Sequence, residues 1–350
     1  MLQVKPITRE TVDAWTVAES GLPVRVVNSV TPIGVATIGQ LRLKSDAELL
    51  ALRSLGKISL GHIRSFFKLC NQIEQGKQTF QNLREVFAIF LDEPELSVLS
   101  ARYGFERKDL VASRDCVTLQ EIGNAQNKTR ERVRQVQETA MRQLQSRLAR
   151  VCFQPFTDHF ISYVDNLGRV ANCADLAPLQ SDPVLAGCNV CSILLLLSDL
   201  HPDRITFHNG FFSTAPLSII GHIEKRAMEV LEESDAPVSL DSLLNRASPN
   251  PDNSHTDHAR RMVSCVMDHC PSVAATLDNR YFLYSKGTAA FLSEVLQEME
   301  RPAHYRAITT SFNDRLKPLS RKGAGFILDM LNANPQCTRV DRGIYDLKAL

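Results

Sequence analysis

The sequence has no long hydrophobic run and no apolar, signal-like segment at its start. Its apolar runs are short, and the run at residues 193–197 is far below the ~20 residues that a membrane-spanning helix needs. The first fifteen residues contain no apolar core followed by small residues, so they do not read as a secretory signal. We therefore expect a cytoplasmic, nucleoid-associated protein without a membrane partner.

Paired cysteines and recognisable catalytic motifs are also lacking. The 9 cysteines are an odd number at irregular spacing, so we expect buried, reduced thiols rather than a disulfide scaffold. One Cys-x-x-Cys pair at residues 188–191 and the group His255, His258, Cys265 and His269 are more typical of core and surface positions than of a zinc site. No P-loop, Ser/His/Asp set or paired carboxylates stand out. The sequence thus predicts no metal, no cofactor and no enzymatic activity.

The net charge is only +1, which at face value argues against a nucleic-acid-binding protein. The regional charges nevertheless differ in sign. Residues 1–150 hold 22 Lys/Arg and 16 Asp/Glu, a net charge of +6, whereas residues 151–350 hold 18 and 23, a net charge of −5. Within the first part, residues 21–70 and 101–150 carry +5 each. The regional charges are a better guide than the net charge of the whole sequence. They indicate that the first part binds a polyanion.

Residues 20–72 have the pattern of a helix, a glycine hairpin and a second helix. Ser45 followed by Glu48 predicts a capped helix start, Gly56 follows that helix, and Ile63 lies in the next one. Glycine lets a DNA backbone approach closely, and the second helix offers free amides at its N-terminus. The pattern favours phosphate binding, and its alternative is a module of this kind that serves only as a protein contact.

The stretch from Leu22 to Phe67 resembles the C-terminal domain of the bacterial RNA polymerase alpha subunit. It has Val-Arg-x-x-Asn at 24–28, Ile-Gly-x-Leu at 38–41 and Leu-Gly-Lys-x-Ser-Leu at 55–60. The resemblance implies that an arginine and an asparagine enter the minor groove of A/T-rich DNA while the hairpin approaches phosphates. The DNA-binding residues that it predicts are Arg25, Asn28, Ser29, Gly56, Lys57 and Ser59. Ile58 stands where the family has a second lysine, which should weaken phosphate binding.

Residues 78–150 have the pattern of a helix-turn-helix. Thr118 with Glu121 predicts a capping box at the start of a short helix. Residues 124–128 are the expected turn, and Thr129 is the expected cap of a longer basic helix. The second helix of such a pair reads the major groove from its N-terminal end. The alternative is an amphipathic helix with a solvated basic face.

The stretch from Arg102 to Leu148 resembles region four of the primary bacterial sigma factors. It has Arg-Tyr-Gly at 102–104, Thr-Leu-x-Glu-Ile-Gly at 118–123 and Thr-Arg-Glu-Arg-Val-Arg-Gln at 129–135, with the family's spacing between the last two. The resemblance implies that Arg130 contacts guanine, Glu131 accepts from cytosine and Gln135 reads a further base. The remaining predicted contacts, to phosphates or in support of the helix, are those of Lys128, Thr129, Arg132 and Arg134.

Two departures from the sigma pattern bear on function. Residues 106–116 form a longer and more polar insertion than the family has, and Lys128 stands where an apolar residue usually packs. No part of the sequence resembles sigma region two, which melts the promoter. The sequence therefore predicts promoter-like DNA binding by a protein that is not a complete sigma factor.

Residues 151–350 contain three copies of one plan, whose openings are spaced by 64 to 67 residues. Each copy combines two short helices, a longer helix and a closing strand–turn–strand, which is typical of a winged helix. The longer helices are expected at residues 187–200, 257–269 and 319–332. The first is almost wholly apolar, which favours packing or dimerisation. Candidates for weak DNA contacts at the starts of the other two are Arg260, Arg261, Arg321 and Lys322.

The predicted fold class is mainly α, with a helix-hairpin-helix module, a helix-turn-helix module and tandem winged-helix repeats that carry small β-hairpin wings. The expected divisions are residues 1–19 (an N-terminal extension), 20–72, 78–150, 155–216, 222–286 and 289–350. The favoured function is a sequence-specific transcription regulator that binds double-stranded DNA, with RNA polymerase or another protein contacting residues 151–350. The alternative is a non-enzymatic DNA-targeting or scaffold subunit of a defence, CRISPR-type or recombination complex. The pattern leaves the oligomeric state open, and a homo-oligomer is compatible with it.

Overall fold

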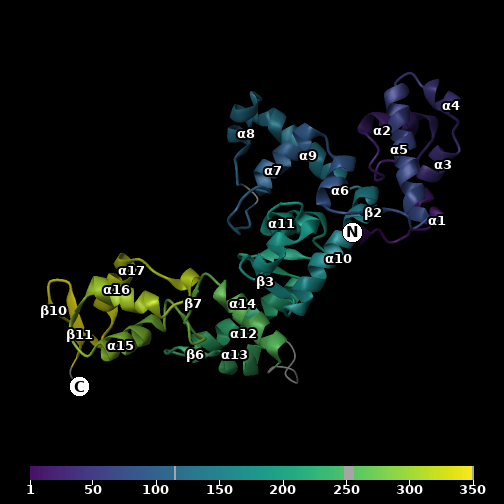
Figure 1. Cartoon of the computed structure of the whole chain (residues 1–350). Helices are drawn as coiled ribbons and strands as arrows, with labels where there is room; N and C mark the ends of the chain where they lie inside the picture. Colours follow the sequence, from purple (N-terminus) through teal and green to yellow (C-terminus); the bar gives the residue numbers. More distant parts are fainter. Residues whose placement is uncertain (114–115, 248–255, 349–350) are drawn as a thin grey trace. The chain divides into compact units, whose positions relative to one another are not determined.

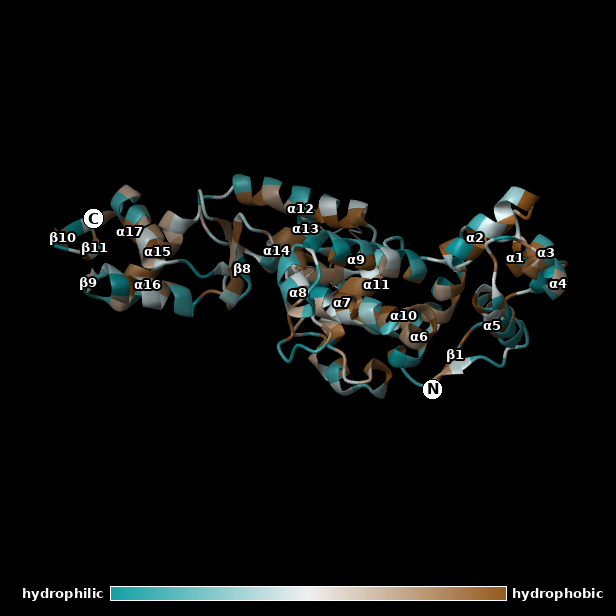
Figure 2. Cartoon of the chain, turned by 90° about the horizontal axis from the view of Figure 1, so that it is seen from above, coloured by the Kyte–Doolittle hydropathy of each residue, from teal (hydrophilic) through white to brown (hydrophobic). Residues whose placement is uncertain are grey.

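The computed structural model describes residues 1–113, 116–247 and 256–348 (Figure 1). It is mainly helical with small antiparallel sheets, which confirms the predicted fold class. The protein forms two compact units, Met1–Tyr163 with Cys173–Ile205, and Val164–Asn172 with Thr206–Leu350. Hydrophobic and hydrophilic residues alternate around most helices, as expected of amphipathic helices packed on a core (Figure 2). None of the described helices is both long and apolar enough to cross a membrane.

The helix-hairpin-helix module lies in the first unit. Its elements are α1 (Arg9–Asp13), α2 (Val24–Val30), η1 (Thr31–Ile33), α3 (Ile38–Arg42), α4 (Asp46–Leu50) and α5 (Lys57–Glu74). The predicted capping box is present, because Ser45 accepts from the Glu48 amide and the Glu48 carboxylate accepts in return. Part of the expected N-terminal extension belongs to this module, since Val12 of α1 is fully buried. Asp13 and Arg42 form an ion pair at 2.9 Å that joins α1 to α3.

The helix-turn-helix module follows in the same unit. Its elements are α6 (Leu83–Phe90), α7 (Glu93–Tyr103), α8 (Leu119–Gln126) and α9 (Arg130–Leu144). A small apolar core of Val98, Ile122, Val133 and Val136 holds α7, α8 and α9 together. A short two-stranded pair, β1 (Leu2–Gln3) with β2 (Thr79–Phe80), precedes α6. The predicted turn at residues 124–128 is partly wrong, because α8 continues to Gln126 before a left-handed residue ends it.

The three winged-helix copies share one order of elements. The first has α10 (Arg147–Asn166), β3 (Val170–Asn172), η2 (Ala177–Ser181), η3 (Pro183–Leu185), α11 (Val190–Leu200), β4 (Thr206–His208) and β5 (Phe211–Ser213). The second has α12 (Leu217–Glu232), β6 (Val238–Ser239), α13 (Leu240–Ala247), α14 (Asp257–Asp268), β7 (Val273–Ala275) and β8 (Arg280–Leu283). The third has α15 (Thr288–Met299), β9 (Ala303–His304), α16 (Tyr305–Asp314), η5 (Pro318–Ser320), α17 (Ala324–Ala333), β10 (Cys337–Asp341) and β11 (Ile344–Leu347).

The structure corrects the predicted proportions of these copies. The first helix of each is the longest, with 20, 16 and 12 residues, whereas the helix expected to be longest has 11, 12 and 10. That helix begins at Val190 rather than 187 in the first copy and at Ala324 rather than 319 in the third. Each closing hairpin also gains a third strand, so the sheets are ordered β3-β5-β4, β6-β8-β7 and β9-β11-β10.

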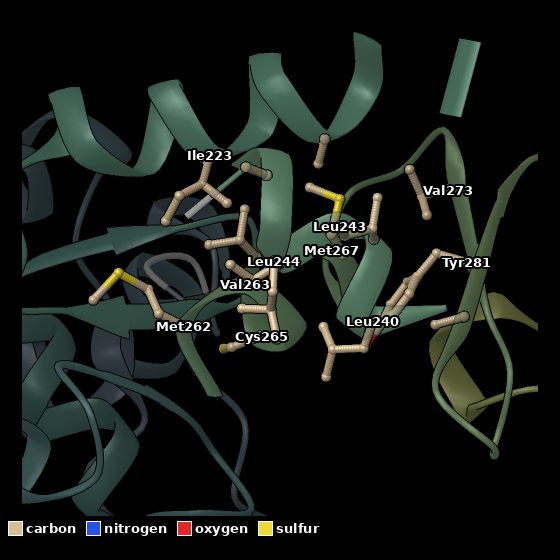
Figure 3. Packing of buried hydrophobic residues seen from close by; sticks show 14 of the residues in the cluster. Ile223, Leu240, Leu243, Leu244, Met262, Val263, Cys265, Met267, Val273 and Tyr281 are labelled. Atoms are coloured by element: carbon tan, nitrogen blue, oxygen red, sulfur yellow. The ribbon is translucent and has the colours of Figure 1, made fainter. Parts of the chain in front are cut away.

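The second copy has a compact apolar core (Figure 3). Leu240, Leu243 and Leu244 of α13 pack there with Val263 of α14 and with Tyr281 of β8, and all of them are buried. The third copy docks on the wing of the second by main-chain bonding. The Lys317 amide donates to the Ala275 carbonyl at 2.9 Å, and the Leu277 amide donates to the Arg315 carbonyl at 2.8 Å. The outer edge of β7 is therefore covered by the next copy.

Candidate nucleic-acid interface

The turn between α8 and α9 is tight, and two residues make it possible. Asn127 ends α8 in the left-handed region at φ 52°. The backbone of Gly123 lies so close to the turn that a Cβ there would stand 2.6 Å from the Lys128 carbonyl oxygen. Thr129 then caps α9 by accepting from the Arg132 amide at 3.1 Å. A side chain at position 123 would push the two helices of this motif apart, so glycine sets their angle.

The predicted reading residues gather on one exposed face at the start of α9. Arg130, Glu131, Arg132, Arg134 and Gln135 are all exposed, as is the cap Thr129. The opposite face buries Val133 and Val136 against α7 and α8. Lys128 is half-buried, and its Nζ donates to Gln126 Oε1 at 3.0 Å. The structure thus brings the seven predicted residues together, with Lys128 at the edge of the face.

The reading face is held by its own side chains. Arg134 donates through Nε and an Nη atom to the two carboxylate oxygens of Glu131, at 2.8 and 2.7 Å, and it also pairs with Glu138. Gln135 Nε2 donates to Glu131 Oε1 at 3.2 Å. These donors, Arg134 first, hold the pKa of Glu131 at about 2. The carboxylate is therefore fully ionised at neutral pH and fixed as an acceptor in front of the helix.

A second exposed group lies in the helix-hairpin-helix module. Arg25 and Asn28 are exposed on α2, one turn apart. Arg25 Nε donates to the Ser54 carbonyl in the loop before α5 at 3.0 Å, which fixes the guanidinium beside the hairpin. Gly56 caps α5 without a side-chain bond, and Lys57 is exposed at its first position. Arg25 thus lies beside the hairpin and Lys57 opens the helix that follows it, whereas their predicted contacts with DNA, and that of Asn28, stay predictions.

The two predicted serines of this module are buried. Ser29 Oγ donates to the Arg25 carbonyl at 2.6 Å and lies 2.8 Å from Ser54 Oγ. Ser59 is 7% exposed. The hydroxyl of Ser29 is therefore used inside the module, where it ties α2 to the loop that carries the hairpin. Its predicted contact with DNA stays a prediction.

The hairpin leaves open space where a ligand backbone would pass. A Cβ added at Gly56 would meet nothing within 4 Å, and its φ of −96° is accessible to any residue. Neither packing nor backbone conformation thus demands glycine here. Ile58, which replaces the family's lysine, is 79% exposed beside it. The surface of the hairpin thus includes an exposed apolar side chain where the family has a second cationic one.

The remaining four candidates are less well placed. Arg260 lies in the first turn of α14 and pairs with Asp241 of α13. Arg261 lies beside it on the same turn and is half-buried. Arg321 and Lys322 lie between η5, which ends at Ser320, and α17, which begins at Ala324. They therefore precede α17 and are not part of its first turn. The Lys322 ammonium sits 3.8 Å from the centre of the Tyr284 ring, so this side chain is engaged in packing.

The apolar helix of the first copy binds the sigma-like insertion, which the sequence did not reveal. Asn189, fully buried at the N-terminus of α11, donates to the carbonyls of Arg107 and Asp109 at 3.1 and 2.9 Å. Its amide donates to the Phe105 carbonyl at 2.7 Å. Ser192 Oγ donates to the Gly104 carbonyl at 3.0 Å. The prediction that this helix serves packing is confirmed, and its partner is the end of α7 with the loop that follows.

The cysteines and histidines carry no sign of metal binding in the described ranges. His255 lies outside them, and no group of three His, Cys, Asp or Glu side chains that could hold an ion occurs among the described residues. All nine cysteines are free thiols. Burial raises the pKa of Cys70 to about 12, so this thiol is protonated and unreactive at neutral pH.

Comparison with known families identifies two parts of the protein. Residues 8–68 match the family of the C-terminal domain of the bacterial RNA polymerase alpha subunit, and residues 91–146 match sigma-70, region 4. Both resemblances seen in the sequence are thereby confirmed. No curated protein and no solved structure matched the sequence. The first unit therefore contains two domains of DNA-binding, transcription-related families, neither of which is an enzyme family.

Proposed function

From these two transcription-related DNA-binding domains, we propose that the protein is a sequence-specific regulator of transcription that binds double-stranded, promoter-like DNA. The observation that carries the proposal is the exposed set of Arg130, Glu131 and Gln135 at the start of α9. An arginine, a carboxylate and an amide on the first two turns of α9 supply a pair of donors, an acceptor, and a group that both donates and accepts, which suit the major-groove edges of different bases. The Arg25 and Asn28 pair supports a second contact to A/T-rich DNA.

The charge distribution supports a protein partner for the first two winged-helix copies. Residues 151–288 hold 9 Lys/Arg and 16 Asp/Glu, whereas residues 289–350 hold 9 and 7. The acidic charge thus belongs to the first two copies, and it would repel DNA phosphates. We propose that these copies contact RNA polymerase or another protein, and that Arg321 and Lys322 of the third copy contribute at most weak DNA contacts.

The decisive experiment is selection of bound sequences from random DNA, with and without RNA polymerase. The parent should enrich one motif, and the double variant Arg130→Ala with Gln135→Ala should relax preference at two positions. Each lost base contact should cost on the order of 1–3 kcal/mol of discrimination. Arg226→Ala, which removes an exposed arginine of α12, is the control and should leave the motif unchanged. An unaltered motif in the double variant would contradict the assignment of α9.

A scaffold subunit of a larger nucleoprotein assembly is the second candidate function. It is supported by the way the copies use their surfaces, since α11 is buried on the sigma-like insertion and β7 is covered by the third copy. Surfaces that are already covered by other parts of the protein favour a structural role for residues 151–350. Purification of the tagged full-length protein would distinguish the two. A stable complex without RNA polymerase subunits supports the scaffold, and co-purification of polymerase supports the regulator.

A further inference from the structure

The segment before α2 is fastened by main-chain hydrogen bonds to the start of α10, which follows directly on the last residues of the helix-turn-helix module. The Arg147 amide at the start of α10 donates to the Glu19 carbonyl at 2.8 Å, and the Leu148 amide donates to the Ser20 carbonyl at 3.4 Å. Ser20 is fully buried, and its hydroxyl donates to the Val17 carbonyl at 2.7 Å. The segment just before α2 is therefore part of a packed joint and not a loose linker.

Glycine is required at this joint. Gly21 has φ +102°, a conformation that side chains disfavour, and a Cβ there would stand 2.6 Å from Ser146 Oγ. A second tie lies at the other side of the helix-hairpin-helix module. There Leu2 and Gln3 pair with Phe80 and Thr79 in an antiparallel ladder directly before α6. Two separate attachments restrict rotation of one domain against the other.

A cationic groove of about 660 Å³ runs along the joint. Arg142, Arg147 and Arg150 line one side, and Val24 and Val27 of α2 line the other. Glu19, 3.6 Å from Arg147, is the carboxylate of the lining. Arg142 and Arg150 are exposed, and no carboxylate among the described residues lies within ion-pair distance of either. Three arginines beside one carboxylate give the groove a net positive charge, which suits a phosphodiester backbone.

The groove also lies between the two reading faces. Val24 and Val27 share α2 with Arg25 and Asn28, and Arg142 lies on α9, whose other end carries Arg130 and Gln135. At 1.5 Å per residue, the 15 residues of α9 span about 22 Å, less than one turn of B-DNA. DNA that engages both faces can therefore pass along the arginines, where the carboxylates of Glu19 and Glu138 are each paired with an arginine.

We infer that the two domains read DNA as one body: a composite site in which an A/T-rich element and a major-groove motif stand at one fixed spacing, with the intervening phosphates on Arg142, Arg147 and Arg150. The inference rests on the proposed function and adds to it a rule of spacing. Domains on a flexible linker would tolerate many spacings, because a linker only sets their effective concentration. A packed joint allows one.

The test uses the full-length protein and duplexes that join the motif selected by α9 to an A/T-rich tract. Affinity should peak at one spacing and fall about tenfold or more when about five base pairs are inserted, which turns the elements to opposite faces. Insertion of about ten base pairs should not restore it, because the second element then lies a full turn away. Equal affinity at all spacings, with each element still bound alone, would overturn the inference. Binding of neither element would instead overturn the proposed function.

Gly21→Val probes the joint itself. The clash with Ser146 should open it, so the variant should bind each element alone as the parent does but lose the preference for one spacing. Gly34→Val is the matched control, because Gly34 has φ +80° with nothing within 4 Å of a Cβ. It should keep the spacing preference. A Gly21→Val protein that folds and retains the preference would contradict the role of the joint, and if it does not fold, the spacing series on the parent decides alone.

The arginine groove has its own readout. Arg142→Ala and Arg150→Ala should each lower the slope of log affinity against log salt by about one on the composite duplex, since each removes a phosphate contact. Neither should change the selected sequence. Arg301→Ala, an exposed arginine of the third winged-helix copy, should leave the slope unchanged. Parent-like slopes in both groove variants would show that DNA does not cross the groove and would overturn that part of the inference.

Discussion

At the scale of single residues, the two predicted DNA-contact surfaces, at the start of α9 and at the hairpin before α5, are formed in different ways. Glu131 is placed by Arg134 and Gln135, so its position is fixed by neighbours on its own helix. At the hairpin, Gly56 has no side chain, so the space beside its backbone stays open. At His201, which lies outside both surfaces, burial lowers the pKa of the imidazole.

Gly56→Ala should weaken DNA binding without weakening the fold. The added methyl group meets nothing in the protein but occupies the space that a DNA backbone would use. We expect a melting temperature close to that of the parent, because the restriction that alanine places on the unfolded state is offset by its poorer capping of α5. The measurement is affinity for the A/T-rich duplex beside a thermal melt. Gly325→Ala, which also adds a methyl group into open space, is the control. Unchanged affinity would argue that the hairpin does not approach DNA.

His201 should make stability depend on pH. Burial, helped by the positive charges of Arg150 and Arg204, lowers its pKa from 6.5 to about 4. Between these values the unfolded protein binds a proton that the folded protein does not, so the free energy of unfolding falls as the pH drops from 6.5 towards 4. By pH 4 the free energy of unfolding should have fallen by about 3 kcal/mol. In His201→Leu this component should vanish, so the difference between the two proteins should change with pH. If the free energies of unfolding of the two proteins ran parallel against pH, His201 would not be the group responsible.

At the scale of elements, α11 is the clearest case of a helix with a new use. It occupies the position that reads DNA in a winged helix, yet ten of its eleven residues are buried. Its N-terminus holds the sigma-like insertion by the side chain of Asn189. The insertion that departs from the family pattern is therefore explained as the surface on which α11 docks.

Asn189→Ala should destabilise the first unit. The change leaves the partly buried carbonyls of Arg107 and Asp109 without the donor that Asn189 supplies, which should cost about 1–3 kcal/mol. Denaturant unfolding monitored on the parent and variant gives the value. Gln120→Ala, which removes only a surface bond to Asn124, should change stability by less than about 0.5 kcal/mol. A variant as stable as the parent would show that the docking contact is not needed.

Sequence patterns located the local features of these elements and missed the contacts between distant ones. The capping box of Thr118 and Glu121 depends on residues three apart, and the structure confirms it. The strands β6 and β9 have two residues each, too few to show an alternating pattern. The bonds from Arg147 and Leu148 to Glu19 and Ser20 join residues far apart in the sequence, so only the folded structure shows them. The family resemblance predicts a DNA contact for Ser29, whereas the burial of Ser29 follows from its contact with Ser54 in a loop 25 residues away.

At the scale of the whole molecule, the protein has two compact units, and apolar clusters lie within each of them. The DNA-binding family matches both lie in the first unit. Calorimetric unfolding should therefore show two transitions rather than one. Addition of the composite duplex should raise the temperature of only one of them, because a ligand stabilises the part that binds it. Asn189→Ala should lower that same transition. Equal shifts of both transitions on adding DNA would show that the second unit also binds it.

If α9 reads DNA as we propose, the bonds among Glu131, Arg134 and Gln135 affect how the protein finds its site. On an arbitrary sequence the bonds between Glu131, Arg134 and Gln135 stay intact, because phosphates alone offer no donor to replace those on the carboxylate. The helix then meets the duplex with part of its charge already neutralised, which weakens its hold and speeds sliding. Only a base pair with a suitable amino group exchanges these partners, so motion along the duplex slows where the sequence matches.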